Sequence, residues 1–166
     1  ARQARFVSTP EEFARLVEGC AIAVAGLTNG RVGIAPHSLR AVTPEELKQI
    51  LLLSQHAPIH IHIAEQKREV EECRARLGKP PVAWLMDNAP VDPRWCLVHA
   101  THAGPAELQA VAASGAVVGL CPLTEANLGD GLFPLDDFLS RSGKFGIGSD
   151  SNILIDCAEE LRLLEY

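Results

Sequence analysis

The sequence predicts an α/β fold, a partial (β/α)8 barrel in which about five β/α units are present. Short apolar segments alternate with helical patterns along the chain, which is typical of a parallel sheet covered by helices. Ionisable residues follow almost every expected strand. The chain has 166 residues, whereas a complete barrel takes roughly 250.

The elements are expected from apolar patterning and from helix-start signals. Thr9 before Pro10 marks one helix start, and the spacing from Thr43 to Glu46 matches a capping box. The expected helices are 10–19, 43–54, 65–77, 80–86, 105–114, 135–140 and about 157–166. The expected strands are 32–35, 58–64, 95–100, 116–121 and 144–147. A long polar loop is expected between 122 and 134.

One domain, or part of one, is expected over 1–166, since no linker or internal repeat is visible. The chain begins at a helix and stops inside one, which favours a truncated barrel. An open doubly wound sheet is the alternative architecture, because it also alternates strands and helices.

Composition narrows the class of partner. Apolar residues make up 47% of the chain and charged residues 22%, with a net charge of −6. This acidic balance and the low aromatic content argue against nucleic-acid binding, and no apolar run approaches the roughly 18–20 residues of a membrane span. Five cysteines, an odd number without a CxxC pair, favour a reduced, cytoplasmic chain. A small molecule or another protein is the expected partner.

Ionisable and amide side chains gather after the expected strands. They are His37, Arg40, His62, Glu65, His99, Glu125, Asn127 and Asp150. In a closed barrel the carboxyl ends of the strands surround one pocket. In an open sheet, five strands about 4.8 Å apart would spread these groups over roughly 19 Å. Their distribution therefore favours the barrel.

The strand Ile59–Ile63 places its isoleucines on one face and its two histidines on the other. In a barrel the histidines point inward, where hydrogen bonds alone could satisfy His60. Glu65 could be a first-turn helix residue, and Asp150 could be the N-cap of the last helix.

Taken together, His62, Glu65, His99 and Asp150 match the needs of metal-assisted hydrolysis. Imidazole and carboxylate suit zinc. A second carboxylate can shuttle protons, and another imidazole can hold the water or a developing oxyanion.

Five segments then resemble the deaminase branch of the amidohydrolase superfamily and, more narrowly, the N-formimino-L-glutamate deiminases of histidine degradation. They are PHSLRAV (36–42), PIHIHIAEQ (58–66), WCLVHATH (95–102), TEANLGDG (124–131) and GSDS (148–151). The histidine–glutamate and Ser-Asp elements indicate only the branch, whereas HSLRAV and TEANLGDG are narrower. Order and spacing agree from about residue 6 to the end.

The resemblance implies a metal-dependent hydrolase barrel, of which 1–166 is the C-terminal part. His62 and Asp150 would be the metal ligands of barrel strands five and eight. Glu65 would be the general acid/base, and His99 would orient water or polarise the reacting group. Strands one to three, with their His-x-His ligand pair, and an accessory β-domain would be absent, which leaves the metal site incomplete and the sheet edges unpaired.

The implied reaction is hydrolysis of a small anionic amidine, N-formimino-L-glutamate, to N-formyl-L-glutamate and ammonia. One zinc ion per active site is implied, with iron as the alternative because the ligands suit both. Arg40, with His37 beside it, suits a substrate carboxylate, and Glu125 and Asn127 would shape the pocket. Dimers are common in the family, so a homodimer is compatible with it.

Two other functions are kept as alternatives. A deaminase of the same branch could act on a purine, a pyrimidine or a nucleoside derivative, which would not require Arg40. A non-catalytic binding protein on a barrel remnant would need no metal.

Overall fold

A computed structural model describes residues 7–54 and 56–166 of the chain. Its centre is a four-stranded parallel sheet of β1 (Ile59–Ile63), β2 (Trp95–His99), β3 (Val117–Leu120) and β4 (Lys144–Ile147), side by side in chain order. Because parallel crossovers are right-handed, this order places successive crossover helices on one face of the sheet. The topology is therefore that of a barrel segment, since a doubly wound sheet reverses its order at a switch point.

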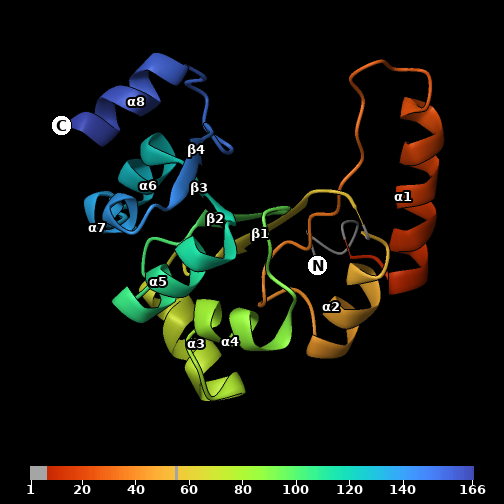
Figure 1. Ribbon diagram of the computed structural model, residues 1–166, viewed down its shortest axis with the longest axis horizontal. Coiled ribbons are helices and arrows are strands. Elements are labelled where there is room, and N and C mark those ends of the chain that lie inside the picture. The colour runs from red at the N-terminus through yellow and green to blue at the C-terminus, as the bar shows by residue number, and fades with distance from the viewer. Residues whose placement is uncertain (1–6, 55) are drawn as a thin grey trace.

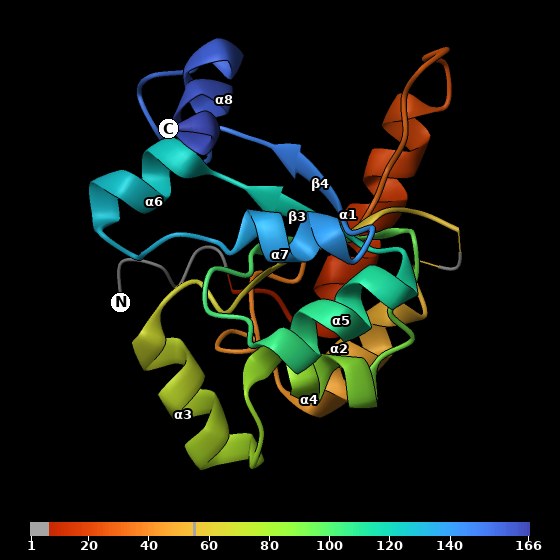
Figure 2. The ribbon, with the colours of Figure 1, turned by 60° about the vertical axis from the view of Figure 1, so that its left-hand side comes forward.

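The helices of the described residues lie around the sheet. They are α1 (Pro10–Val24), α2 (Pro44–Leu51), α3 (Lys67–Leu77), α4 (Pro81–Asn88), α5 (Pro105–Ser114), α6 (Pro122–Leu128), α7 (Leu135–Ser140) and α8 (Cys157–Glu165). Helix α3 contacts α4, α4 contacts α5, and α5 contacts α7. Figure 1 shows α3, α4 and α5 grouped below the sheet, with α6 and α8 together near β4. Figure 2 shows α7 beside α5.

The main core lies between the sheet and these helices. The three isoleucines of β1 are buried, whereas His60 is exposed and His62 half-buried on the opposite face. Trp95 and Leu97 of β2 are in register with Ile59 and Ile61 and are also buried. The alternation predicted for β1 is confirmed, and it directs the histidines of β1 away from the helices.

The expected strand at 32–35 is not a strand in the structure. Its segment runs parallel to β1 but forms only two isolated bridges, from Ile34 to Ile59 and from Ser38 to His62. Pro36, between them, has no N–H for a ladder hydrogen bond. The segment is still held close, because a Cβ on Gly33 would lie 2.5 Å from the carbonyl oxygen of Pro58.

The loop expected over 122–134 was a second wrong prediction, because its first part is helix α6. Pro122 occupies the first helical turn, and Gly129 ends the helix in the left-handed conformation with φ 69°. Both residues are ordinary helix-end signals. The N-cap at Thr9 and the capping box at Thr43 are confirmed, and Thr9 also forms a capping box, with Glu12. In the described part of the chain no helix is long and apolar enough to cross a membrane.

Replacement of Ile61 by alanine is expected to lower the free energy of unfolding by about 2–5 kcal/mol, because it leaves a cavity at a fully buried site. Arg68 of α3 is the control, since its side chain is 84% exposed and its change to alanine should cost less than about 0.5 kcal/mol. Urea unfolding of the complete protein that contains this chain measures both. Equal losses would contradict the burial described for β1.

Candidate active site

His99 lies at the centre of a polar cluster at the carboxyl ends of the strands. Its ring is buried, and Nδ1 lies 3.1 Å from Oε1 of Glu125. Because an ionised carboxylate only accepts, Nδ1 donates this hydrogen bond. The other nitrogen, Nε2, lies 3.8 Å from both Glu65 Oε1 and Asp150 Oδ2. It has no hydrogen-bond partner among the described residues, so it is free to meet a ligand.

Unusual backbone conformations at the ends of the strands direct the side chains of the cluster toward one another. By strand alternation alone, His99 would point the same way as Leu97, toward the helices. Its φ of 70° is in the left-handed region, as are those of Ala64, Ala100 and Asp150 at 50–51°. Such conformations are costly for non-glycine residues and gather at functional sites. Here they lie at or just beyond the ends of β1, β2 and β4.

His62 faces the cluster from β1. Its Nδ1 donates to the backbone carbonyl of His37 at 2.8 Å, so Nε2 is the ring nitrogen left for a ligand. This is the usual outer hydrogen bond of a metal-binding histidine. The His62 ring stacks on that of His37 at 4.8 Å between centroids and lies 5.6 Å from that of His99.

Arg40 reaches the cluster from the segment beside β1. Its Nη2 donates to Glu65 Oε2 at 3.3 Å and lies 4.0 Å from Glu69 Oε2. The Arg40 side chain is 38% exposed and that of Glu65 14%. A guanidinium that is partly exposed beside an acid suits an incoming carboxylate. His37, whose Nδ1 lies 3.1 Å from Ser38 Oγ, contacts the cluster through the His62 ring on which it stacks.

The structure shows what Glu125 contacts. It is buried on α6, and its Oε1 accepts both the His99 ring N–H and the backbone N–H of Cys121, the latter at 3.0 Å. Asn127, on the same helix, is exposed, and the hydrogen bonds of the described residues do not join it to the cluster.

Two alternative readings of the acids do not hold. Glu65 is not in the first turn of a helix, because α3 begins at Lys67 rather than at 65. Asp150 is not the N-cap of α8, because Asp156 fills that place. Asp150 instead accepts the N–H of Ser151 with one oxygen and faces His99 with the other.

Glu69 was missed by the sequence analysis. It is buried, and it accepts the backbone N–H groups of Ala64 and Glu65 at 3.0 and 2.9 Å. The only sequence sign is a glutamate four residues after Glu65, which helix surfaces commonly show.

The cluster alters the protonation of its members. Burial opposes the charged form of His99, but the hydrogen bond to Glu125 and the nearby carboxylates outweigh it and raise its pKa. Burial lowers the pKa of His37, and the positive charges of His62 and Arg40 lower it further. Burial and neighbouring carboxylates raise the pKa of Cys121 to about 12, so this thiol is no nucleophile at neutral pH.

The residues present fit part of a metal site. Imidazole Nε2 atoms and the Asp150 carboxylate are donors that zinc accepts. However, no three His, Cys, Asp or Glu side chains within residues 7–54 and 56–166 form a group that could hold a metal ion. His62 and Asp150 would therefore need further ligands from elsewhere.

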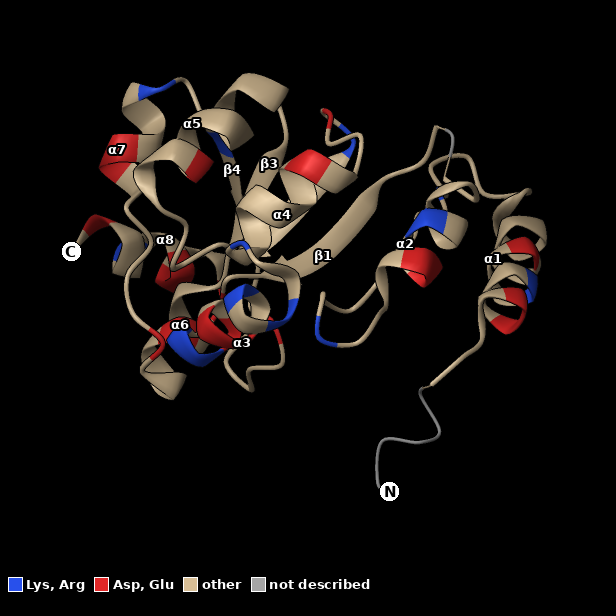
Figure 3. Cartoon of the chain, turned by 90° about the horizontal axis from the view of Figure 1, so that it is seen from below, with Lys and Arg blue, Asp and Glu red and all other residues tan. Residues whose placement is uncertain are grey.

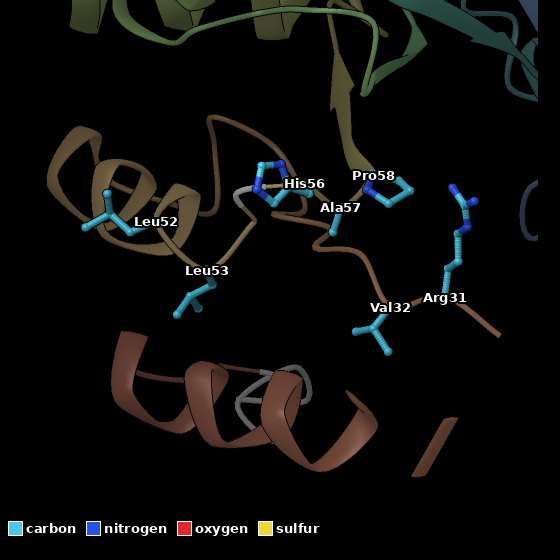
Figure 4. Close-up of a pocket in the computed structure, with 7 residues that line it drawn as sticks. All are labelled: Arg31, Val32, Leu52, Leu53, His56, Ala57 and Pro58. Atoms are coloured by element: carbon cyan, nitrogen blue, oxygen red, sulfur yellow. The ribbon is translucent and has the colours of Figure 1, made fainter. Parts of the chain in front are cut away.

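A separate hollow of about 510 Å³ lies at the opposite ends of the strands, near Pro58. Figure 4 shows its lining, which includes Arg31, His56 and the leucines that follow α2. It contains none of the clustered acids and histidines. The carboxyl ends of the strands remain the candidate active site.

Both the barrel-type sheet and the histidine–carboxylate cluster at its carboxyl edge are features of metal-dependent hydrolases. Residues 4–165 match the amidohydrolase family, and the chain belongs to that family.

Individual relatives show which members of the family this chain resembles. The chain is 50% identical over 165 residues to formimidoylglutamate deiminase of Pseudomonas aeruginosa, covering 99% of this chain and 36% of the relative. A crystal structure of an amidohydrolase from Brucella melitensis is 56% identical, with a TM-score of 0.96 over 99% of this chain and 37% of that one. An adenosine deaminase from Xanthomonas campestris with bound zinc is 26% identical, with a TM-score of 0.80 over 93% and 36%. The chain thus spans little more than a third of these relatives.

Proposed function

We propose that this chain is the C-terminal part of the barrel of a zinc-dependent deiminase that acts on N-formimino-L-glutamate. The observation that carries the proposal is the buried His99, whose unpartnered Nε2 faces Glu65 and Asp150. The 50% identity to formimidoylglutamate deiminase supports this choice of substrate. The products would be N-formyl-L-glutamate and ammonia.

His62 and Asp150 would hold the zinc ion, with remaining ligands from barrel strands outside this chain. When bound, the ion lowers the pKa of water toward neutrality. Asp150 takes up a proton from the attacking water, and His99 orients that water through Nε2. The Glu125 hydrogen bond keeps Nδ1 protonated, which reserves Nε2 for that task.

Glu65 is the proton carrier in this scheme. Water adds across the C=N bond of the formimino group, with its oxygen bonded to the carbon and one of its protons delivered to the nitrogen by Glu65. The second proton, taken up by Asp150, then passes to the same nitrogen as the hydroxyl becomes the carbonyl and the C–N bond breaks to release ammonia. Arg40 binds a substrate carboxylate, with His37 beside it. Glu125 acts by holding His99, whereas Asn127 is exposed on the same helix and has no step in this scheme.

We also place the reaction in the cytoplasm, which agrees with five free cysteines.

The test is ammonia release by the complete protein encoded by the reading frame that contains this chain, purified with zinc. N-formimino-L-glutamate is expected to turn over, and about one zinc ion should be bound per site. Bound zinc without turnover would discard this substrate but keep the hydrolytic centre. Absence of bound metal would favour a binding protein instead.

A purine or nucleoside deaminase is the second candidate, favoured by the likeness to the zinc-containing adenosine deaminase structure. Adenosine, guanine and cytosine assayed under the same conditions distinguish it. Turnover of one of these bases, with none of the amidine, would replace the first proposal.

A further inference from the structure

Glu69 is a buried carboxylate that hydrogen-bonds the backbone of Glu65, the proposed general acid/base, and of the residue before it. It is 2% exposed, and its two oxygens accept the backbone N–H groups of Ala64 and Glu65 at 3.0 and 2.9 Å. Figure 3 shows acidic and basic positions side by side on α3. Among them Glu72 is exposed and bonds Arg68 at the surface, whereas Glu69 is turned inward.

The contact differs from an ordinary helix cap. In a capping box the third helical residue accepts the N–H of the N-cap itself, as Glu12 and Glu46 do elsewhere in this chain. Gln66 is the N-cap of α3 and makes no side-chain cap. Glu69, the third helical residue, passes over Gln66 and holds the two residues before it.

Those two residues form the turn that directs Glu65. Ala64 has a φ of 51°, a conformation that costs of order 1–3 kcal/mol unless its surroundings enforce it. Two hydrogen bonds to one ionised carboxylate are among the stronger contacts available to do so. Arg40 lies 4.0 Å from Glu69 and 3.3 Å from the Glu65 carboxylate, so one cation compensates both acids.

We infer that Glu69 is a positioning residue, which holds the Ala64–Glu65 turn so that the Glu65 carboxylate faces His99. It does not contact the reacting atoms. The inference rests on the proposed function only where it predicts an effect of Glu69 on turnover. The clamp, by which we mean the two hydrogen bonds from the Ala64 and Glu65 amides to Glu69, rests on the geometry alone.

Hydrogen exchange of the complete protein tests the clamp without substrate. Glu69→Gln can accept only one of the two N–H groups, so whichever of the Ala64 and Glu65 amides loses its acceptor should exchange at least about tenfold faster. Glu72→Gln, one turn along α3, is the matched control and should leave both amides unchanged. Unchanged exchange in Glu69→Gln would overturn the inference. If Glu69→Gln does not fold, Glu69→Asp, which keeps the charge but shortens the reach, takes its place.

Kinetics then separate positioning from a merely structural role. In Glu69→Gln, kcat for N-formimino-L-glutamate should fall about 10- to 100-fold, with KM and bound zinc within about twofold. In a Glu65→Gln background the same change should cost almost nothing, because its effect passes through Glu65. Equal losses in both backgrounds would overturn the inference. Absence of turnover in the wild-type protein would instead reject the proposed substrate, and the exchange result would still decide the role of Glu69.

Discussion

Replacement of Glu65 by glutamine is expected to lower kcat by about 10²–10⁴-fold, the usual contribution of a positioned general acid or base. Glutamine keeps the size of the side chain and can still contact Arg40, but it cannot carry a proton. Because the Glu65 carboxylate lies 3.8 Å from His99 Nε2, it would be placed to deliver a proton where, in the proposed mechanism, that ring orients water. Steady-state ammonia release at saturating substrate measures the loss.

The controls for this change concern metal and fold. Bound zinc should stay at the wild-type level, since Glu65 is not assigned as a ligand. Glu72→Gln, exposed on α3, should keep the wild-type kcat. A Glu65→Gln protein with full zinc and undiminished kcat would contradict the assignment and move the proton transfer to Asp150.

Residues that obey local rules were predicted well. The isoleucines of β1 follow a period of two and are buried as expected, and the Thr43–Glu46 pair caps α2. The order of strands also placed ionisable residues at one edge of the sheet, where His99, Glu65 and Asp150 do converge. Period and capping depend on neighbours within a few residues, which a sequence displays directly.

Contacts between distant residues could not be predicted in this way. The hydrogen bond from His99 to Glu125 joins residues 26 positions apart, and it depends on α6, whose segment the polar sequence predicts to be a loop. The left-handed backbone of His99 reverses the direction that strand alternation predicts. The strand prediction for 32–35 was wrong for a related reason. The pairing of this segment depends on how closely it approaches Pro58 rather than on its apolar residues.

Arg40 links the site to the choice of substrate. The chain carries a net charge of −6, and the site itself contains four carboxylates, those of Glu65, Glu69, Glu125 and Asp150. An anionic substrate needs a cation among these acids, and Arg40 contacts two of them. A substrate carboxylate at Arg40 would therefore compete with the Glu65 ion pair, which couples binding to the state of the proton carrier.

Replacement of Arg40 by alanine is thus expected to lower kcat/KM for N-formimino-L-glutamate by about 10²–10³-fold, equivalent to about 3–4 kcal/mol for two charge-assisted hydrogen bonds. Formamidine, which has no carboxylate, separates this effect from any disturbance of Glu65. Its slow turnover should be unchanged within about threefold if Arg40 serves the carboxylate, because uniform binding energy is then all that is lost. Arg68→Ala, at the exposed ion pair with Glu72, is the control. A similar loss for both substrates would show that Arg40 acts through Glu65, and no loss for either would favour a deaminase of neutral bases.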